Sequence, residues 1–281
     1  MTQCRLTPRK IQTYIRHLQL EEKSKATVEK YSRDVRSFAD WLGGRAITKE
    51  LTSQWKASLV AQGYAPTSVN AMLSALNSLL EFLDLRECQV KFLKIQRRLF
   101  RDASRELTKC DYQQLLSAAR DLNRTRLELL IETIGATGIR VSEVAYITVE
   151  AVRQGKAEIS LKGKVRVILL PGKLCRKLTK FAQKQKTASG AIFRTKSGKE
   201  LGRRQIWAEL KALCKHAGVD PHKVFPHNLR HLFATVFYQA CKDIAKLADL
   251  LGHSSIETTR IYLVTSGTEH QKELDRLGLV S

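Results

Sequence analysis

The sequence predicts a mainly α-helical protein with one small β-hairpin, divided into an N-terminal helical domain and a C-terminal mixed α/β domain. Apolar residues recur at helical spacing through most of the chain, whereas strand-like segments occur only around residues 158–170. A length of 281 residues is enough for two domains that each bury a core. A basic run separates the two parts, so we place the domains at residues 1–95 and 108–281, with a basic linker at residues 96–107.

The N-terminal part is expected to consist of helices alone. The apolar spacing predicts helices at about residues 7–22, 27–42 and 49–61, and a fourth that begins at Pro66. Internal repeats and low-complexity tracts are absent from the sequence. This part is therefore expected to be a compact helical domain.

The C-terminal part alternates helices with a short β region. Thr108 is expected to cap its first helix, and an apolar helix at residues 127–134 ends near Gly135. The expected strands, and the tight turn between them, are residues 158–161, 165–170 and 162–164. A tail helix at about residues 269–277 is amphipathic, although a frayed terminus is the alternative.

The charge predicts a polyanionic partner. Lys and Arg number 49 against 27 Asp and Glu, which gives a net charge of +22. Residues 1–107 hold 19 basic against 11 acidic side chains, and the remainder holds 30 against 16. Both halves are thus basic, as two jaws around a DNA duplex would be. A membrane surface is a weaker alternative, because no apolar run reaches spanning length and no amphipathic anchor stands out.

The cysteines and the first residues predict a cytoplasmic protein without a metal or cofactor. The six cysteines are scattered, with no Cys-x-x-Cys pair and no zinc spacing, which is typical of reduced structural thiols. The first residues are polar, so no signal peptide is expected. The sequence also lacks a clustered carboxylate set that would hold Mg²⁺.

The stretch from Pro226 to Leu263 carries the most specific pattern. His227 and Arg230 lie three residues apart at the start of an expected helix, where backbone N–H groups and the helix dipole favour a phosphate. His253 follows a helix that stops at Gly252. Tyr262 comes nine residues later, on a third helix expected to begin with a capping box at residues 254–257. A lone His or Tyr is ordinarily structural, but the four together provide a nucleophile and cations for metal-free attack on a phosphodiester.

These residues resemble the tyrosine recombinase (phage integrase) family. The family's first motif has a counterpart in Thr137-Gly138-Ile139-Arg140-Val141-Ser142-Glu143, and the later motifs have theirs in the stretch above. The resemblance covers residues 108–265 strongly and the N-terminal part weakly. It implies the tyrosine recombinase fold, with an N-terminal core-binding domain and a C-terminal catalytic domain. The chain has no room for the arm-binding domain of large phage integrases, so it resembles the simple two-domain Xer type.

The resemblance implies a role for each site residue. Tyr262 would attack phosphorus and form a 3′-phosphotyrosine, while Arg140 and Arg230 would hold the non-bridging oxygens. His227 would accept or relay the tyrosine proton, and His253 would donate to a phosphate oxygen. The hairpin lysine would protonate the leaving 5′ oxygen. The turn is one residue shorter than the commonest family pattern, which leaves two lysines as candidates for this role. The resemblance favours Lys162, because it precedes a glycine as the family's lysine usually does, and Lys164 is the alternative. Glu143 would orient the site, with a helix-surface ion pair as the alternative.

Further residues are candidates for DNA contact. Two helix starts resemble those of the family's core-binding domain, although ordinary helix capping is the alternative for each; their residues are Ser24, Lys25, Thr27, Thr67, Ser68 and Asn70. The basic run across the domain junction would contact phosphates without reading sequence, and a solvated face is the alternative. It comprises Lys91, Lys94, Arg97, Arg98, Arg101 and Arg105.

The sequence therefore predicts a site-specific recombinase that binds double-stranded DNA, as a dimer on one site and a tetramer on two. In the family the C-terminal helix commonly docks on a neighbouring protomer. A type IB topoisomerase shares the nucleophile and cations but relaxes DNA as a monomer. A non-catalytic DNA-binding regulator would share the charge but need not keep the catalytic residues. The task itself stays open among dimer resolution, transposon resolution, integration and inversion.

Overall fold

The structure is a computed structural model that describes residues 4–95, 103–161, 164–195, 197–253, 255–260, 262 and 275–276. The chain divides into two compact units, Met1–Arg97 and Arg98–Ser281, called here the N-terminal and C-terminal units. Both are mainly helical, and the strands of the described residues form one two-stranded antiparallel sheet in the C-terminal unit. The predicted fold class is confirmed.

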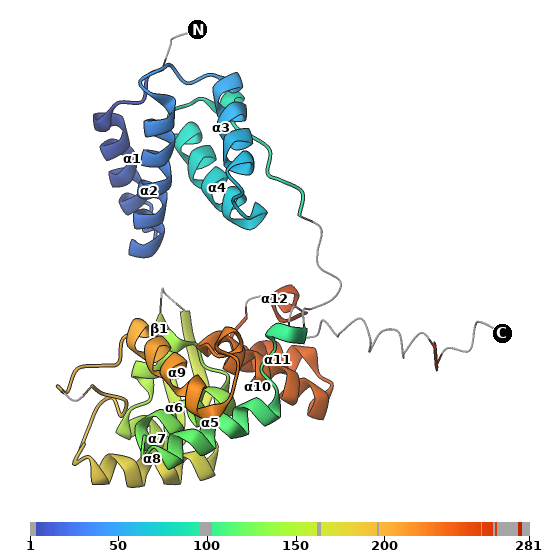
Figure 1. Cartoon of the computed structure of the whole chain (residues 1–281). Coiled ribbons are helices and arrows are strands. Elements are labelled where there is room, and N and C mark those ends of the chain that lie inside the picture. The colour runs from blue at the N-terminus through green and yellow to red at the C-terminus, as the bar shows by residue number, and fades with distance from the viewer. Residues whose placement is uncertain are drawn as a thin grey trace. The chain divides into compact units, whose positions relative to one another are not determined.

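The N-terminal unit is a four-helix domain (Figure 1). Its helices are α1 (Pro8–Leu20), α2 (Lys25–Leu42), α3 (Lys49–Ala61) and α4 (Pro66–Phe82), followed by the 3-10 turn η1 (Arg86–Cys88). The side chains of Thr7, Ser24 and Thr48 each accept a backbone N–H at a helix start, which fixes where α1, α2 and α3 begin. Helix α2 packs against α1 and α4, and α3 packs against α4.

Two of the contacts that α2 makes with its neighbours illustrate how this unit packs. In its core the rings of Phe38 and Trp55 meet edge to face, with their centroids 5.0 Å apart. At its edge Lys30 forms an ion pair with the buried Asp34 and also donates to Ala71 O at 3.0 Å. The hydrogen bond to Ala71 links α2 to α4, and the ion pair gives the buried carboxylate of Asp34 a charged partner.

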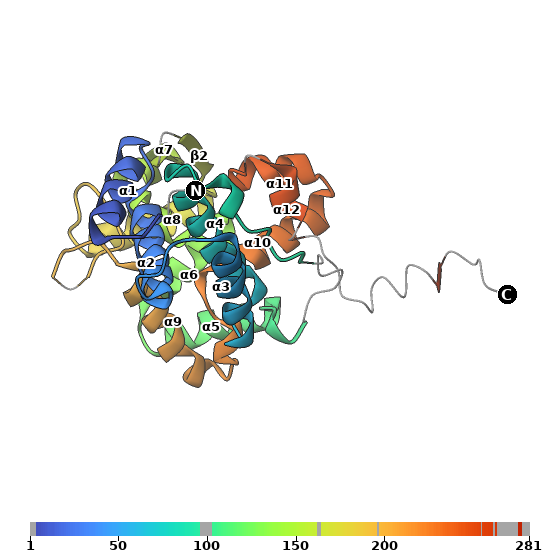
Figure 2. The same ribbon diagram turned by 90° about the horizontal axis from the view of Figure 1, so that it is seen from above.

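The C-terminal unit is built around the largely buried helix α6, Thr125–Thr137. Its elements are η2 (Ala103–Arg105), α5 (Lys109–Asp121), α6 (Thr125–Thr137), η3 (Val141–Tyr146), α7 (Val149–Gln154), β1 (Lys156–Leu161), β2 (Lys164–Leu169), α8 (Gly172–Lys184), α9 (Arg203–Ala217), η4 (Pro221–Lys223), α10 (Pro226–Cys241), α11 (Ile244–Leu251) and α12 (Ile256–Arg260). Helix α6 packs against α5, α8 and α10 (Figure 1), and α11 and α12 lie next to α10 at one end of the unit (Figure 2). This arrangement brings the two sequence blocks with catalytic-type residues to neighbouring elements.

The structure corrects three predicted boundaries. Helix α6 runs through Gly135 and ends at Thr137, because Gly138, with φ of +63°, makes the left-handed turn that ends a helix. Tyr262 lies in a turn after α12 rather than within that helix. Leu107 is buried in the core of the C-terminal unit, so this unit already includes part of the expected linker. The remaining linker residues, 96–102, lie outside the described residues.

The first strand of the hairpin begins two residues before its expected start, and the second strand begins one residue before its expected start. The register of the hairpin runs from Lys156 opposite Leu169 to Leu161 opposite Lys164, so only residues 162 and 163 connect the strands. On β2 the inward face carries Arg166 and Ile168, whereas the outward Val165 and Val167 are 73% and 49% exposed. An arginine therefore faces the interior of the unit from the middle of an apolar strand.

In the part of the chain that is described, no helix is both long and apolar enough to cross a membrane.

Candidate active site

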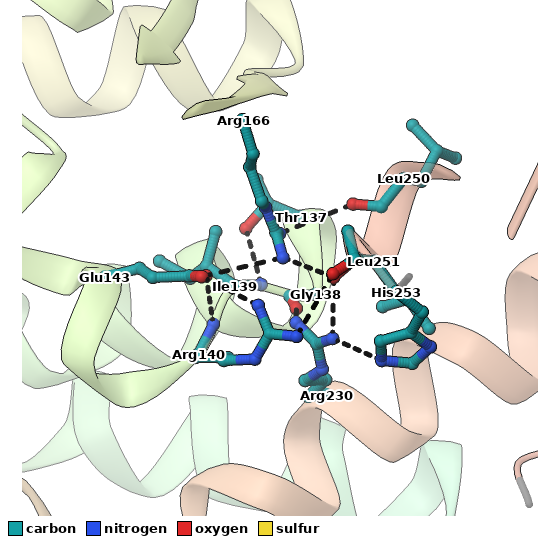
Figure 3. Close-up of polar contacts among 11 residues, drawn as sticks. Thr137, Gly138, Ile139, Arg140, Glu143, Arg166, Arg230, Leu250, Leu251 and His253 are labelled. Atoms are coloured by element: carbon teal, nitrogen blue, oxygen red, sulfur yellow. Dashed lines mark hydrogen bonds and ion pairs between the residues drawn. The ribbon is translucent and has the colours of Figure 1, made fainter. Parts of the chain in front are cut away.

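Five chain segments meet in one cluster of the C-terminal unit. Figure 3 shows four of them, which are the start of η3, strand β2, helix α10 and the turn after α11. The fifth is the turn after α12, which carries Tyr262. The cluster contains three guanidinium groups and the buried carboxylate of Glu143, so its formal charge is positive with neutral histidines. Such a site attracts an anion.

Arg230 is fixed in place by main-chain carbonyl groups. It is 2% exposed, and its Nη1 donates to Gly138 O at 2.5 Å while its Nη2 donates to Leu251 O at 2.8 Å. Burial is the main cause that lowers the pKa of Arg230, and a hydrogen bond with Tyr262 opposes that shift. The residue is thus a rigid cation beside the tyrosine (Figure 3 shows its carbonyl contacts).

Arg140 is oriented by Glu143 but keeps a route to solvent. Glu143 accepts from Arg140 N at 2.7 Å and from Arg140 Nη1 at 3.0 Å. The side chain of Arg140 is 43% exposed, whereas that of Glu143 is 3% exposed. Its Nη2 also reaches Gly252 O at 3.4 Å. This geometry suits an arginine that is pre-aligned by its own helix start and can still meet an external phosphate.

His253 lies between Arg230 and Thr259. Its Nε2 is 2.9 Å from Arg230 Nη2, and its Nδ1 is 2.8 Å from Thr259 Oγ1. Because a guanidinium can only donate, Nε2 accepts, and we assign the ring proton to Nδ1. Burial and the nearby cations, first Arg230 and then Arg140, lower the pKa of His253 to about 4. The imidazole is therefore neutral at pH 7 in the free protein.

Tyr262 packs among three histidine rings. It is 4% exposed, and its ring lies 5.7 Å from that of His253, nearly parallel to it, and 5.1 Å from that of His231. The ring of His227 is 6.1 Å away. The tyrosine, the histidines and both arginines thus come from one chain.

Three members of the cluster were not identified from the sequence: His231, Thr259 and Arg166. His231 follows His227 by four residues on α10, a spacing that places both on one side of a helix. Thr259 is fully buried and fixes His253. Arg166 interrupts an apolar strand, which is a signal that the sequence does contain.

The predicted proton donors lie at the edge of what the structure describes. Lys162 lies outside the described residues, and of Lys164 only the backbone, at the start of β2, is described. The role of the hairpin lysine therefore stays a prediction.

Several DNA-contact candidates have structural roles. Ser24 caps α2 and contacts Thr27 Oγ1 at 2.8 Å. The side-chain amide of Asn70 accepts a hydrogen bond from Leu93 N at 2.8 Å and donates one to Leu93 O at 2.9 Å. The exposed candidates among the described residues are Lys25, Thr67, Ser68, Lys91, Lys94 and Arg105. Arg97, Arg98 and Arg101 lie outside them.

The described residues contain no group of three or more His, Cys, Asp or Glu side chains placed to hold a metal ion. All six cysteines are free thiols.

Comparison with known proteins covers both units. Residues 105–268 match the profile of the Phage integrase family, and residues 11–87 match the profile "Phage integrase, N-terminal SAM-like domain". The chain is 29% identical to tyrosine recombinase XerA of Pyrococcus furiosus, over 96% of this chain and 94% of that protein. It is also 29% identical to tyrosine recombinase XerD of Vibrio cholerae, over 88% of each.

A similar fold occurs in the solved structure of a lambda integrase tetramer bound to a Holliday junction. The TM-score is 0.73 at 17% identity, over 90% of this chain and 76% of that one.

Proposed function

Because the chain belongs to the phage integrase family and is a site-specific tyrosine recombinase, we propose that Tyr262 is the nucleophile that cleaves and rejoins its DNA. The observation that carries this proposal is the packing of Tyr262 against Arg230 and His253 within one chain. The relatives reported above are recombinases and an integrase, which favours recombination over the topoisomerase and regulatory alternatives.

The arginines would bind the scissile phosphate. Arg140 is half-exposed and fixed by Glu143, and Arg230 is held by two carbonyl groups. Guanidinium groups remain charged at neutral pH and bind phosphate oxygens in pairs. Fixed in advance, they stabilise the extra charge of the pentacoordinate phosphorus without reorganising during the reaction.

The covalent step conserves the phosphodiester energy. The phenolic oxygen of Tyr262 attacks phosphorus, the bond from phosphorus to the 5′ oxygen breaks, and a 3′-phosphotyrosine forms. The tyrosine proton passes to His227, which is exposed on the first turn of α10. The leaving 5′ oxygen takes a proton from Lys162. Attack by a 5′ hydroxyl from another strand reverses the step, so neither ATP nor a metal ion is required.

The partner of this reaction is double-stranded DNA. Net charge of +22 and the exposed lysines of the N-terminal unit support phosphate contacts from both units. We place the protein as a dimer on one site and a tetramer on two, supported by the lambda integrase tetramer that shares the fold. The C-terminal tail that would link protomers lies outside the described residues except for Asp275 and Arg276. A cytoplasmic location completes the proposal, since free thiols and a DNA substrate suit that compartment.

Trapping the covalent adduct tests the nucleophile. The DNA site is first selected from a random pool, and a nicked duplex of that site then traps the adduct. Tyr262→Phe should bind this DNA with wild-type affinity and form no adduct, because a phenyl ring has no nucleophilic oxygen. The wild-type protein should still form the adduct when EDTA is present from the start. Adduct formation by the Phe variant would move the nucleophile to another residue, and loss of cleavage in EDTA with recovery on Mg²⁺ would contradict the metal-free mechanism.

A further inference from the structure

We propose that Arg166 is a positioning residue, which holds the turn that carries His253 against the start of η3, where Arg140 lies. The inference rests on the proposed function, because it concerns how that site is aligned. Arg166 itself would touch neither the phosphate nor the nucleophile.

Arg166 connects three elements that are distant in sequence (Figure 3). From β2 its Nη1 donates to Leu251 O, and its Nη2 reaches Leu250 O at 3.4 Å, both at the end of α11. The same Nη1 lies 3.6 Å from Glu143 Oε1 in η3. One guanidinium therefore sets the distance between the end of α11 and the carboxylate that orients Arg140.

The carbonyl of Leu251 links Arg166 to the residues that are proposed to bind the phosphate. It accepts from both Arg166 and Arg230, and Arg230 in turn contacts His253 Nε2 at 2.9 Å. If Arg166 were lost, the carbonyl groups of Leu251 and Gly252 would keep their contacts with Arg230 and Arg140, but the turn would lose this link to β2. Those two arginines are the groups that the reaction needs for the phosphate.

The side chain of Arg166 also packs directly on the turn. A Cβ at Gly252 would lie 2.5 Å from Arg166 Cδ, which is closer than any real contact. Gly252 has φ of +62°, a conformation that glycine adopts without strain. The turn and the arginine are thus fitted to each other, which an ordinary solvated arginine would not require.

Stability alone does not explain an arginine at this position. The side chain is 13% exposed, and its buried Nε has no hydrogen-bond partner in the described structure. Burial and the neighbouring Arg230 and Arg140 lower the pKa of Arg166 to about 10, although Glu143 opposes them. A well-packed apolar side chain in such a place is often as stable as a buried charge or more so. The contacts of Arg166 therefore favour alignment as its role.

Arg166 and Arg126 make a matched pair for the test. Arg126 is also partly buried, donates to Arg194 O at 2.6 Å and pairs with Glu209 at 2.6 Å, but it lies outside the cluster. Arg166→Met, Arg166→Lys and Arg126→Met would each be assayed as the full chain on a nicked duplex of the selected site. The readouts are the DNA dissociation constant, the single-turnover rate of adduct formation at saturating protein, and the unfolding temperature.

We expect Arg166→Met to lower the single-turnover rate by on the order of tenfold to a hundredfold, because small misplacements of catalytic groups cost that much. Its dissociation constant should stay within about threefold of the wild-type value, since most phosphate contacts are elsewhere. Arg166→Lys should be slowed too, because one ammonium cannot span both carbonyls and Glu143. Arg126→Met should cleave at close to the wild-type rate even if its unfolding temperature falls.

A wild-type rate in Arg166→Lys or in a folded Arg166→Met would overturn the proposal. So would an equal loss of rate in Arg126→Met, because the effect would then follow stability rather than alignment. Failure of the proposed function is a different result: in that case the wild-type protein itself would form no adduct through Tyr262.

Discussion

The protonation of His253 depends on the guanidinium that it touches. With Arg230 Nη2 at 2.9 Å, the lone pair of Nε2 is already engaged, and that nitrogen has no proton to donate. The proposed donation to a phosphate oxygen therefore requires a second proton on the ring. A bound phosphate supplies the negative charge that favours this proton, so DNA binding should raise the pKa of His253 above its free value of about 4.

DNA binding should accordingly take up a proton. Since the bound pKa exceeds the free pKa, affinity should rise as the pH falls below the bound pKa towards the free value of about 4. Within that pH range, the same proton uptake should appear in calorimetry in buffers of different ionisation enthalpy. His253→Gln should lose this part of the pH dependence while keeping the salt dependence. A pH-independent wild-type affinity would show that His253 stays neutral in the complex.

At the residue scale the sequence identified the groups with distinctive chemistry. Spacing selected His227, Arg230, His253 and Tyr262, and the family resemblance added Arg140. The structure places these five in one cluster, although their roles stay predictions. The sequence shows that Arg166 interrupts an apolar strand, but it does not show which face of the strand is buried, because both faces carry apolar residues. The exposed Val165 and Val167 show that the less apolar face is the buried one.

At the scale of elements, the turn after α11 determines the geometry of the site. Its glycine supplies both the left-handed conformation and the room for Arg166. We expect Gly252→Ala to destabilise the protein by about 1 kcal/mol through the backbone conformation alone. The control is Gly155→Ala, because Gly155 has φ of +70° and a Cβ there would have no neighbour within 4 Å. Since Arg166 must move to make room for a Cβ at residue 252, the Gly252→Ala variant should have a lower single-turnover cleavage rate than the control. Equal rates in the two alanine variants, measured well below their unfolding temperatures, would remove the steric argument.

The hairpin gives a second prediction at this scale, which concerns the proton donor. A 5′-bridging sulfur leaves without protonation, so loss of the true general acid is masked on such a substrate, whereas loss of a phosphate-contacting lysine is not. General acid catalysis is worth on the order of a hundredfold to ten-thousandfold. Lys162→Ala should be slow on ordinary DNA and largely restored on the 5′-thio substrate, while Lys164→Ala behaves alike on both. Rescue of Lys164→Ala instead would shift the assignment by two residues.

Helix positions were largely predictable, because capping residues and apolar spacing act locally. Thr7 and Thr108 cap helices where the sequence placed them, whereas the second helix begins at Lys25, two residues before its expected start. The end of α6 was not predicted, since Gly135 has the composition of a helix stop but Gly138 has the conformation of one. Only the packed structure distinguishes the two.

At the scale of the whole molecule, Tyr262 lies in its own chain's cluster, which predicts cleavage in cis. Mixing Tyr262→Phe with Arg140→Ala should then yield no more adduct than either variant alone, because neither chain holds both the nucleophile and the full set of cations. Arg140 is suited to this test because its side chain is 43% exposed and because Glu143 would still have the backbone N–H of residue 140 and Arg166 as partners. A mixture of wild type and Tyr262→Phe serves as the control and should retain adduct. Restoration of cleavage in the first mixture would mean that one protomer lends its tyrosine to another.

The cations of the cluster are anchored mainly on peptide oxygens, those of Gly138, Leu250, Leu251 and Gly252. Every amino acid carries such an oxygen, so these contacts depend on the backbone conformation and not on the side chains at these four positions. Neutral drift can therefore exchange the side chain at Leu250 for another that suits the helix without loosening the anchor. For the same reason, an engineer can redesign the helices of the N-terminal unit, for which DNA contacts are predicted, without changing the backbone groups that anchor the cations of the cluster.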